Sequence, residues 1–512
     1  MKLSDTATLL ALAATASAEA IQLPVARNAA GSAARKRHPR LSKRATITES
    51  LVNNVTEGGY YASVSVGTPG QALTMVLDTG SSDGFVISAD ADLCTEKRLQ
   101  LLYDETCGAT YNSSESSTYK DLIPDGFEIE YADGTTAEGS YITDDFSIGG
   151  KTVKNLQLGL ASQTAVGTGI LGIGFELNEA AEKQYSNLVA SMANQSLIPT
   201  MAYSLYLNDY YSSMGSIVFG GVDTDKFIGN LNTVPILKDS VSGEYSSFTV
   251  GLSGLEFAFA NGTSYTQSLS SEGGTLDSIL DSGTTLTYLP DTIATPLFEA
   301  VGAYQYSEFL SESTLAIVDC ALDLNFTFRI NSTATIVVPR DELVLDVLTG
   351  SDGDDSLPSD IPFANPCLFG IQNMGDESEE SGGGGGDSTS ISTSTDYAIL
   401  GDSFLRSAYV VYDLDNLQIG IAQANLNSTS SNVQELSADA SGLPAFSGVA
   451  SQTASSPTSS SGSGSSSSSS GTSTASGSSA SGTSTSASGE ASCTSGLSLV
   501  VVLLFVSCCL VG

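Results

Sequence analysis

The sequence predicts a mostly β fold with two lobes, a pseudo-twofold axis and a cleft between the lobes. Two similar segments lie about two hundred residues apart: Val76–Ser82 (Val-Leu-Asp-Thr-Gly-Ser-Ser) and Ile279–Thr285 (Ile-Leu-Asp-Ser-Gly-Thr-Thr). Elsewhere, short β-branched and aromatic runs are broken by Gly, Asp, Asn and Ser, which is typical of strands joined by turns. The expected lobes, residues 45–230 and 231–426, are each long enough to bury a core.

Each repeated segment places one aspartate, Asp78 or Asp281, at the end of an apolar run and before a glycine turn. A duplicated architecture can bring these two corners together, so that two carboxylates face each other across the axis. The turn glycines and the hydroxyls expected to orient the carboxylates are Gly80, Ser81, Gly283 and Thr284.

Two carboxylates a few ångströms apart cannot both ionise easily, so they share a proton and present a base beside an acid. Such a pair can activate water without a metal, a cofactor or a covalent nucleophile. The only histidine, His38, lies in a basic stretch that we expect to be removed. Histidine-dependent nucleophiles and histidine-ligated zinc are therefore disfavoured.

Further motifs around the two aspartates resemble those of the pepsin-type aspartic peptidases, and the resemblance covers roughly residues 57–424. The motifs are Gly67–Pro69, the flap-like segment Phe127–Thr135, the apolar-apolar-Gly segments Gly169–Gly172 and Ala398–Gly401, and Phe404–Asp413. The resemblance implies a bilobal pepsin-like fold and hydrolysis of peptide bonds at acidic pH, with Asp78 and Asp281 as catalytic residues.

The same resemblance places Tyr131 at the flap-tyrosine position, with Asp133 and Gly134 able to form the turn of the hairpin. The family usually carries a tryptophan shortly after the first motif, and its indole N–H supports the flap tyrosine. This chain has no tryptophan and has Phe85 at that place. Because phenylalanine cannot donate a hydrogen bond, we expect a looser flap or a substitute donor.

The N-terminus has the layout of a secretory signal over residues 1–18, with a basic start, an apolar stretch and Ala16-Ser-Ala18 as a cleavage site. Residues 19–44 read as a basic prosegment that ends at the dibasic site Lys43-Arg44, where a kexin-type processing protease is expected to cut. Without residues 1–44, eleven basic and fifty-five acidic residues remain, a formal net charge of −44. This acidity disfavours nucleic acid as a partner.

The C-terminal part changes composition at Asn427. Residues 427–488 are rich in Ser, Thr and Gly and are predicted to be a disordered stalk. Residues 489–512 end in an apolar run that is short for a membrane-spanning helix. With small residues before it, this layout predicts a removed glycosylphosphatidylinositol (GPI) signal, with attachment near Ser486, Ser488 or Gly489. A plain C-terminal membrane anchor is the alternative.

Four of the seven cysteines lie in the predicted body, and secretion favours disulfides over thiols there. Pairing Cys94 with Cys107 and Cys320 with Cys367 keeps each bridge within one lobe, although other pairings are possible. Seven sequons predict N-glycosylation. They begin at Asn54, Asn112, Asn194, Asn261, Asn325, Asn331 and Asn427.

Long helical patterns are few. Residues 178–195 and 291–303 are the predicted helices, and residues 351–360 and 376–395 read as insertions in the second lobe.

A pepsin-like enzyme with a surface anchor and a Ser/Thr-rich stalk resembles the fungal yapsins. These enzymes favour basic residues beside the cleaved bond. Carboxylates that could line a negative cleft wall are Asp83, Asp90, Asp92, Glu96 and Asp133. The sequence thus favours a monomeric, surface-anchored aspartic endopeptidase that acts on peptide and protein substrates at the plasma membrane or cell wall. Two alternatives are an inactive pepsin-like binding or inhibitor protein and a structural cell-wall glycoprotein.

Overall fold

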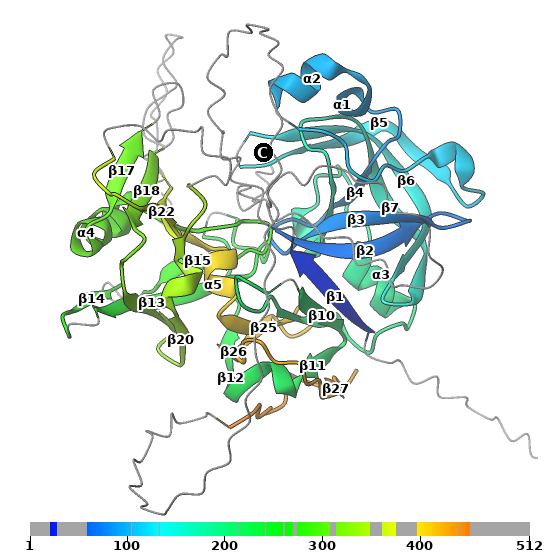
Figure 1. Cartoon of the computed structure of the whole chain (residues 1–512). Helices are drawn as coiled ribbons and strands as arrows, with labels where there is room; N and C mark the ends of the chain where they lie inside the picture. The colour runs from blue at the N-terminus through cyan, green and yellow to red at the C-terminus, as the bar shows by residue number, and fades with distance from the viewer. Residues whose placement is uncertain are drawn as a thin grey trace, which may run out of the picture. The chain divides into compact units, whose positions relative to one another are not determined.

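Runs rich in β-branched and aromatic residues form strands throughout the body, so the mostly β prediction is confirmed (Figure 1). The computed structural model describes residues 21–27, 59–103, 105–132, 134–212, 214–240, 242–259, 262–269, 274–307, 314–348, 361–374, 397–438 and 440–450. These residues belong to one compact unit of the chain.

Several predicted features lie outside the described residues. They are the signal peptide (1–18), most of the prosegment (28–44), both insertions, the stalk beyond residue 450, the GPI signal with Ser486, Ser488 and Gly489, and the individual residues Asn54, Asp133 and Asn261.

The largest sheet of the described chain joins strands from both halves of the sequence. In spatial order it contains β12 (Phe227–Pro235), β26 (Gln418–Ala424), β25 (Ala408–Asp413), β9 (Ala202–Tyr206), β10 (Met214–Phe219), β1 (Ile21–Arg27), β2 (Tyr60–Val66), β3 (Gln71–Asp78), β8 (Gly169–Gly172), β4 (Gly84–Ile87), β7 (Lys151–Thr164), β6 (Thr136–Ile148) and β5 (Lys120–Glu130).

The C-terminal lobe is built mainly from two further sheets. One runs β20 (Ala334–Val338), β19 (Leu324–Ile330), β13 (Thr249–Phe259), β15 (Leu276–Leu280), β24 (Tyr397–Leu400), β16 (Thr287–Leu289) and β23 (Ile371–Asn373), with β14 (Ser264–Ser268) paired to β13. The other runs β17 (Tyr304–Ser307), β18 (Thr314–Asp319), β22 (Pro366–Phe369) and β21 (Val344–Leu345).

The two lobes share the end of the large sheet, where β9 pairs with β25 and β12 pairs with β26. Aromatic rings from three distant segments pack there: the Tyr203 and Tyr412 rings stack at 4.8 Å, and Phe248 meets Tyr412 at 4.7 Å. The predicted lobe boundary at 230/231 falls inside β12, which pairs with a C-terminal strand. The strand at the predicted boundary is therefore hydrogen-bonded to the other half of the chain.

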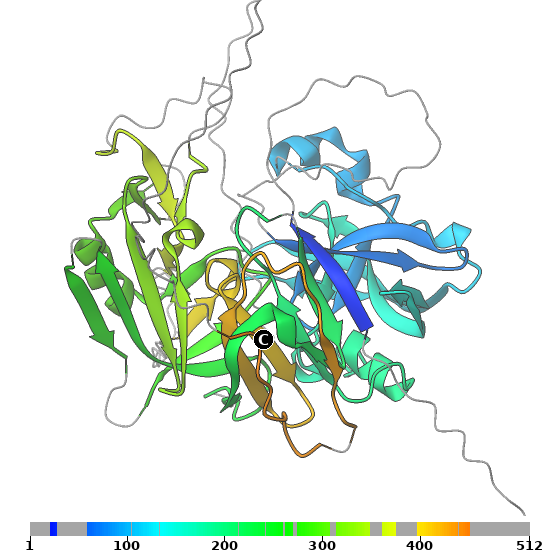
Figure 2. The same ribbon diagram turned by 60° about the horizontal axis from the view of Figure 1, so that its bottom comes forward.

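The predicted start of the stalk at Asn427 is wrong, because residues 427–438 and 440–450 pack on the body. Within them, β27 (Val433–Glu435) pairs with β11 (Gly221–Asp223), and Val449 bridges to Ile228. Leu436 is buried in a cluster that also takes in Phe446. Figure 2 shows this segment in orange beside the green strands. A few apolar residues spaced through a polar stretch are enough to hold it.

Part of the predicted prosegment is a strand. Within residues 19–44, β1 lies between β10 and β2 and pairs antiparallel with both, with Leu23 opposite Ile217 and Val25 opposite Ala62. This strand therefore joins β10 and β2 within the large sheet.

The helices only partly match the prediction. The expected helix at 291–303 is present as α4 (Asp291–Val301). Of residues 178–195, only α3 (Leu188–Asn194) is α-helical. The helix begins there because the Asn187 side chain caps it and accepts a hydrogen bond from the Ala190 N–H at 3.3 Å. Short helices are α1 (Asp92–Thr95), α2 (Lys97–Leu102) and α5 (Asp402–Leu405). In the described part of the chain, no helix combines the length and apolar character needed to cross a bilayer.

Both predicted disulfides are confirmed. Cys94 bonds to Cys107, and Cys320 bonds to Cys367. Each bridge stays within one lobe. The presence of disulfides agrees with a secreted protein.

A fully buried ion pair anchors the C-terminal lobe. The Arg406 guanidinium donates to the Glu342 side chain and, at 3.0 Å, to the Glu342 carbonyl. The other carboxylate oxygen of Glu342 accepts from the Tyr210 N–H at 2.9 Å. This network ties α5 to the loop before β21 and to the segment after β9.

We predict that Glu342→Ala lowers the free energy of unfolding by about 3–5 kcal/mol, because it leaves the Arg406 charge buried without its partner. Denaturant unfolding of the secreted protein measures this loss. The control is Glu256→Ala, which removes the exposed pair with Arg329 and should leave stability near the parental value. Equal losses in both variants would contradict the prediction.

Candidate active site

Asp78 is the last residue of β3 and is fully buried. The Gly80 N–H donates to Asp78 Oδ1 at 2.8 Å, and the Ser81 hydroxyl donates to Asp78 Oδ2. The apolar residues of β3 thus lead into a turn whose own groups hold both oxygens of the carboxylate.

Asp281 follows β15 and repeats this arrangement in the second lobe. The Gly283 N–H donates to Asp281 Oδ1 at 2.8 Å, and the Thr284 hydroxyl donates to Oδ2 at 2.6 Å. Asp281 is also buried. The predicted supporting residues therefore contact the predicted carboxylates in both lobes.

Reciprocal hydrogen bonds hold the two loops against each other. The Thr79 N–H donates to Ser282 Oγ at 3.2 Å, and the Ser282 N–H donates to Thr79 Oγ1 at 2.9 Å. Each hydroxyl in turn donates across the axis at 2.9 Å, Thr79 to the Leu280 carbonyl and Ser282 to the Leu77 carbonyl. Sequence reasoning missed these two residues, although a hydroxyl directly after each aspartate was a visible signal.

The two apolar-apolar-Gly segments run beside the aspartate strands. β8 pairs parallel with β3, which places Gly172 opposite Asp78, and β24 pairs parallel with β15. A Cβ at Gly172 would lie 2.5 Å from the Asp83 carbonyl oxygen, and one at Gly401 would lie 2.2 Å from that of Leu286. Glycine is required at both places because the aspartate loops approach so closely.

Burial raises the pKa of Asp281 well above its usual value, and the negative charge of Asp78 raises it further. The Thr284 hydroxyl and the Gly283 N–H favour the ionised form and oppose this shift. The arrangement can therefore retain one proton on the pair and offer a base and an acid side by side.

Strands β5 and β6 form the predicted flap hairpin, with Glu130 opposite Thr136. At its tip the Tyr131 N–H donates to the Thr135 carbonyl at 2.9 Å, and the Gly134 N–H donates to the Tyr131 carbonyl at 2.8 Å. Gly134 has a φ of +79°, a conformation that glycine adopts without strain.

Phe85 lies beneath this hairpin. Phe85 and Tyr131 belong to one buried cluster, and the Phe85 ring lies 5.5 Å from that of Phe127 on β5. The contact between Phe85 and the flap is therefore apolar.

The prediction that Asp83 lines a negatively charged cleft wall is wrong. Its side chain is fully buried and accepts from the Tyr141 and Tyr185 hydroxyls, both at 2.8 Å, and from the Ala180 N–H at 2.7 Å. A carboxylate with three donors in the core is not available to a substrate.

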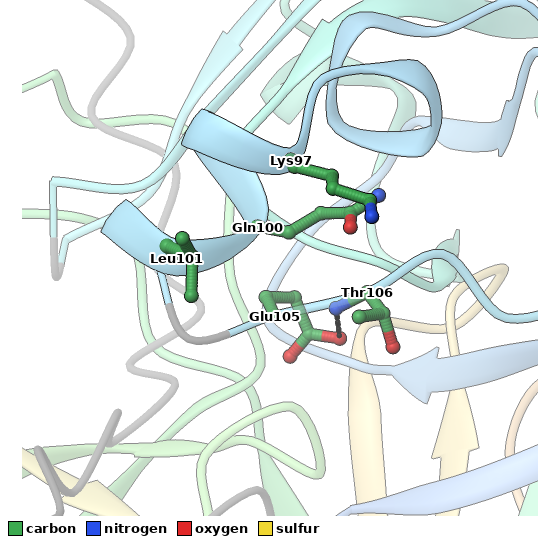
Figure 3. Close-up of a pocket in the computed structure, with 5 residues that line it drawn as sticks. All are labelled: Lys97, Gln100, Leu101, Glu105 and Thr106. Carbon is green, nitrogen blue, oxygen red and sulfur yellow. Dashed lines mark hydrogen bonds between the residues drawn. The ribbon is translucent and has the colours of Figure 1, made fainter. Parts of the chain in front are cut away.

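The remaining described carboxylates of the predicted cleft wall lie near the first disulfide. Asp90 and Glu96 are exposed, whereas Asp92 is half-buried and accepts from the Leu93 and Thr164 N–H groups. A cavity of about 290 Å³ adjoins this loop and is lined by Lys97, Gln100, Leu101, Glu105 and Thr106 (Figure 3). None of these lining residues belongs to the two aspartate loops.

The described sequons differ in exposure. Asn194, Asn325 and Asn427 are exposed, whereas Asn112 and Asn331 are half-buried. The Asn112 amide also donates to the Glu115 carboxylate at 3.2 Å and accepts from the Ser114 N–H at 3.1 Å. The exposed sequons are therefore the better placed glycosylation sites.

Glu179 is a buried carboxyl group that sequence reasoning missed. One of its oxygens accepts from the Tyr185 N–H at 2.7 Å, and the other has no hydrogen-bond partner in the described structure. Burial raises the pKa of Glu179 to about 9, and the negative charges of Asp83 and Glu176 add to the shift. Glu179 is thus held neutral at acidic and neutral pH.

We predict that Glu179 makes the fold less stable as pH rises. The folded chain holds the Glu179 proton more tightly than the unfolded chain, where glutamate ionises near 4.5. Its contribution is therefore complete below about pH 4.5 and is lost as pH rises toward about 9. Thermal unfolding across this range should show a smaller decline for Glu179→Gln than for the parent, while the exposed control Glu182→Gln keeps the parental decline. A parental decline in Glu179→Gln would contradict this assignment.

Comparisons with known proteins agree with this geometry. The family model for eukaryotic aspartyl protease matches residues 59–424, which is more than half of the chain. A probable aspartic-type endopeptidase, opsB of Aspergillus fumigatus, is 39% identical over 409 residues, covering 78% of this chain and 75% of that protein. An acid protease of Saccharomycopsis fibuligera is 36% identical, with 76% and 86% covered. Secreted aspartic protease 3 of Candida albicans is 33% identical, with 77% and 86% covered. The chain belongs to the eukaryotic aspartyl protease family.

Proposed function

We propose that this protein is an endopeptidase that hydrolyses peptide bonds at acidic pH through Asp78 and Asp281. The observation that carries the proposal is the matched hydrogen bonding of two buried carboxylates, one from each lobe, on loops that are bonded to each other. Family membership supports the same reaction.

One carboxyl group of the pair serves as the acid and the other as the base. Burial and the charge of Asp78 raise the pKa of Asp281, which supports a scheme with Asp281 as the protonated partner. Asp78 takes a proton from water, and the water oxygen forms a bond to the scissile carbonyl carbon. Asp281 donates its proton to the carbonyl oxygen and so stabilises the charge that develops there. Collapse of the tetrahedral intermediate breaks the C–N bond. The amine receives a proton from Asp78, and one hydroxyl of the intermediate returns a proton to Asp281 as the new carbonyl forms. The Ser81 and Thr284 hydroxyls hold the carboxylates in orientation throughout.

The flap hairpin covers the bound peptide in this proposal, with Tyr131 above the pair of aspartates. Its position at the tip of a long two-stranded hairpin supports this role. A cover of this kind excludes bulk water and strengthens the electrostatic interactions beneath it.

We also propose a preference for basic residues beside the cleaved bond. The acidity of the chain and the exposed carboxylates Asp90 and Glu96 support it. Lys97 and Arg98, in the adjacent helix α2, are also exposed and weaken the local negative potential. Asp133, which the sequence predicts to form the turn of the flap, is the further acidic residue expected near the substrate.

The proposed setting is the outer face of the plasma membrane, with the cell wall as the alternative site of residence. The signal layout supports secretion, and the dibasic site at Lys43-Arg44 supports processing. The apolar C-terminal run supports GPI anchoring. A relative named as a secreted aspartic protease supports the extracellular location.

The decisive experiment is cleavage of a mixed peptide library at pH 3 to 6 by secreted residues 45–450. We expect Asp78→Asn and Asp281→Asn each to lower turnover by about 10²–10⁴-fold, because each removes an acid–base group. The control Asp277→Asn changes a half-buried carboxyl group on β15 and should keep parental turnover. Cut sites beside Lys or Arg would support the basic preference.

A folded, processed parent without turnover would overturn the endopeptidase proposal and favour the inactive binding protein. Inhibition by a statine-type transition-state mimic would distinguish the enzyme from both that alternative and a wall glycoprotein.

For the anchor, we expect a phosphatidylinositol-specific phospholipase C to release the full-length protein from cells. A chain that ends before Ser486 should instead appear in the medium. N-terminal sequencing of the released protein should begin at Ala45. Retention after phospholipase treatment would point to the plain membrane anchor or to attachment to the wall.

A further inference from the structure

Asp83 joins three parts of the N-terminal lobe. It lies five residues after Asp78, on the loop that leads into β4. Its Oδ1 accepts from the hydroxyl of Tyr141 on flap strand β6 and from that of Tyr185, both at 2.8 Å. Its Oδ2 accepts from the Ala180 N–H at 2.7 Å. One buried carboxyl group thus connects the Asp78 loop, the flap and the segment before α3.

Tyr141 contacts both strands of the hairpin and the segment beyond it. It belongs to β6, and its ring meets that of Phe127 on β5 edge-on at 5.3 Å. It also meets the Tyr185 ring edge-on at 5.8 Å. Because Tyr141 is almost completely buried, a change in its position is transmitted to the packing of both flap strands.

The apolar contact at Phe85 leaves the flap without the indole donor that the family usually has there. Phe85 meets Phe127 at 5.5 Å, but it offers no hydrogen bond. The bond from Tyr141 to Asp83 supplies a polar link between the same two elements, the Asp78 loop and the flap. Directional hydrogen bonds set a position more narrowly than apolar contact alone.

We propose that Asp83 and Tyr141 are positioning residues that hold the flap in register over the Asp78 loop, in place of a bond from the residue at position 85. This inference rests on the proposed function, because it assumes that the flap closes over a bound peptide. Neither residue touches the substrate. Their contribution is to keep the closed position of the flap populated before the peptide arrives.

A less populated closed position weakens apparent peptide binding in proportion to the population lost. Loss of the Tyr141 hydroxyl should therefore act mainly on KM, whereas loss of a catalytic carboxyl group acts on kcat. It should also increase opening of the hairpin in the absence of any peptide.

The test is Tyr141→Phe, which removes one hydroxyl and keeps the ring. The matched control is Tyr111→Phe: Tyr111 is also buried in this lobe, and its hydroxyl donates to the buried Asp144 carboxylate at 2.5 Å. We expect Tyr141→Phe to raise KM about tenfold with a smaller change in kcat. Amide hydrogen exchange near the β5–β6 turn should become faster. Tyr111→Phe should lower the thermal midpoint by about as much as Tyr141→Phe does. It should leave KM and amide hydrogen exchange near the β5–β6 turn at their parental values.

Asp83→Asn is the second variant, and it keeps the shape of the side chain and an oxygen that can accept from tyrosine. Its KM and flap exchange should lie between those of the parent and Tyr141→Phe. If both variants match Tyr111→Phe in KM and in flap exchange, the inference is overturned while the endopeptidase proposal stands. If the parent hydrolyses no peptide, the endopeptidase proposal fails, and flap exchange alone still decides whether Asp83 and Tyr141 hold the hairpin.

Discussion

The site depends on the reciprocal hydrogen bonds between Thr79 and Ser282. Two buried carboxylates repel each other when both are ionised, and burial increases the cost of each charge. The fold must therefore supply forces that keep the two aspartate loops together. The four bonds across the axis do this with backbone groups and hydroxyls, which carry no net charge and leave the carboxylates free to exchange a proton.

The large sheet extends this cross-link through the molecule. Strands β25 and β26 pair with strands from the first half of the chain, so that β9 lies beside β25. The rings of Tyr203 and Tyr412 stack between them. Strand pairing and ring packing thus join the two halves of the chain in addition to the contacts at the site.

A second group of buried acids, Asp83 and Glu179, lies on the flap side of the first lobe. Their pKa values are raised mainly by burial, which favours the neutral forms at low pH. Protonation at low pH removes most of the cost of burying carboxyl groups in a protein core.

The sequence by itself determined the family, the mostly β class, and both aspartates with their supporting glycines and hydroxyls. Each of these is a local pattern, or a duplication of one, and local patterns can be read along the chain. Only the tertiary structure showed that Asp83 and Glu179 are buried, that the two disulfides pair Cys94 with Cys107 and Cys320 with Cys367, and that residues 427–438 and 440–450 pack on the body. Asp83 next to a catalytic motif resembles any acidic loop residue until Tyr141 and Tyr185, 58 and 102 residues away, are brought to it. Burial and long-range hydrogen bonding depend on which distant segments meet, and no local pattern in this chain carries that information.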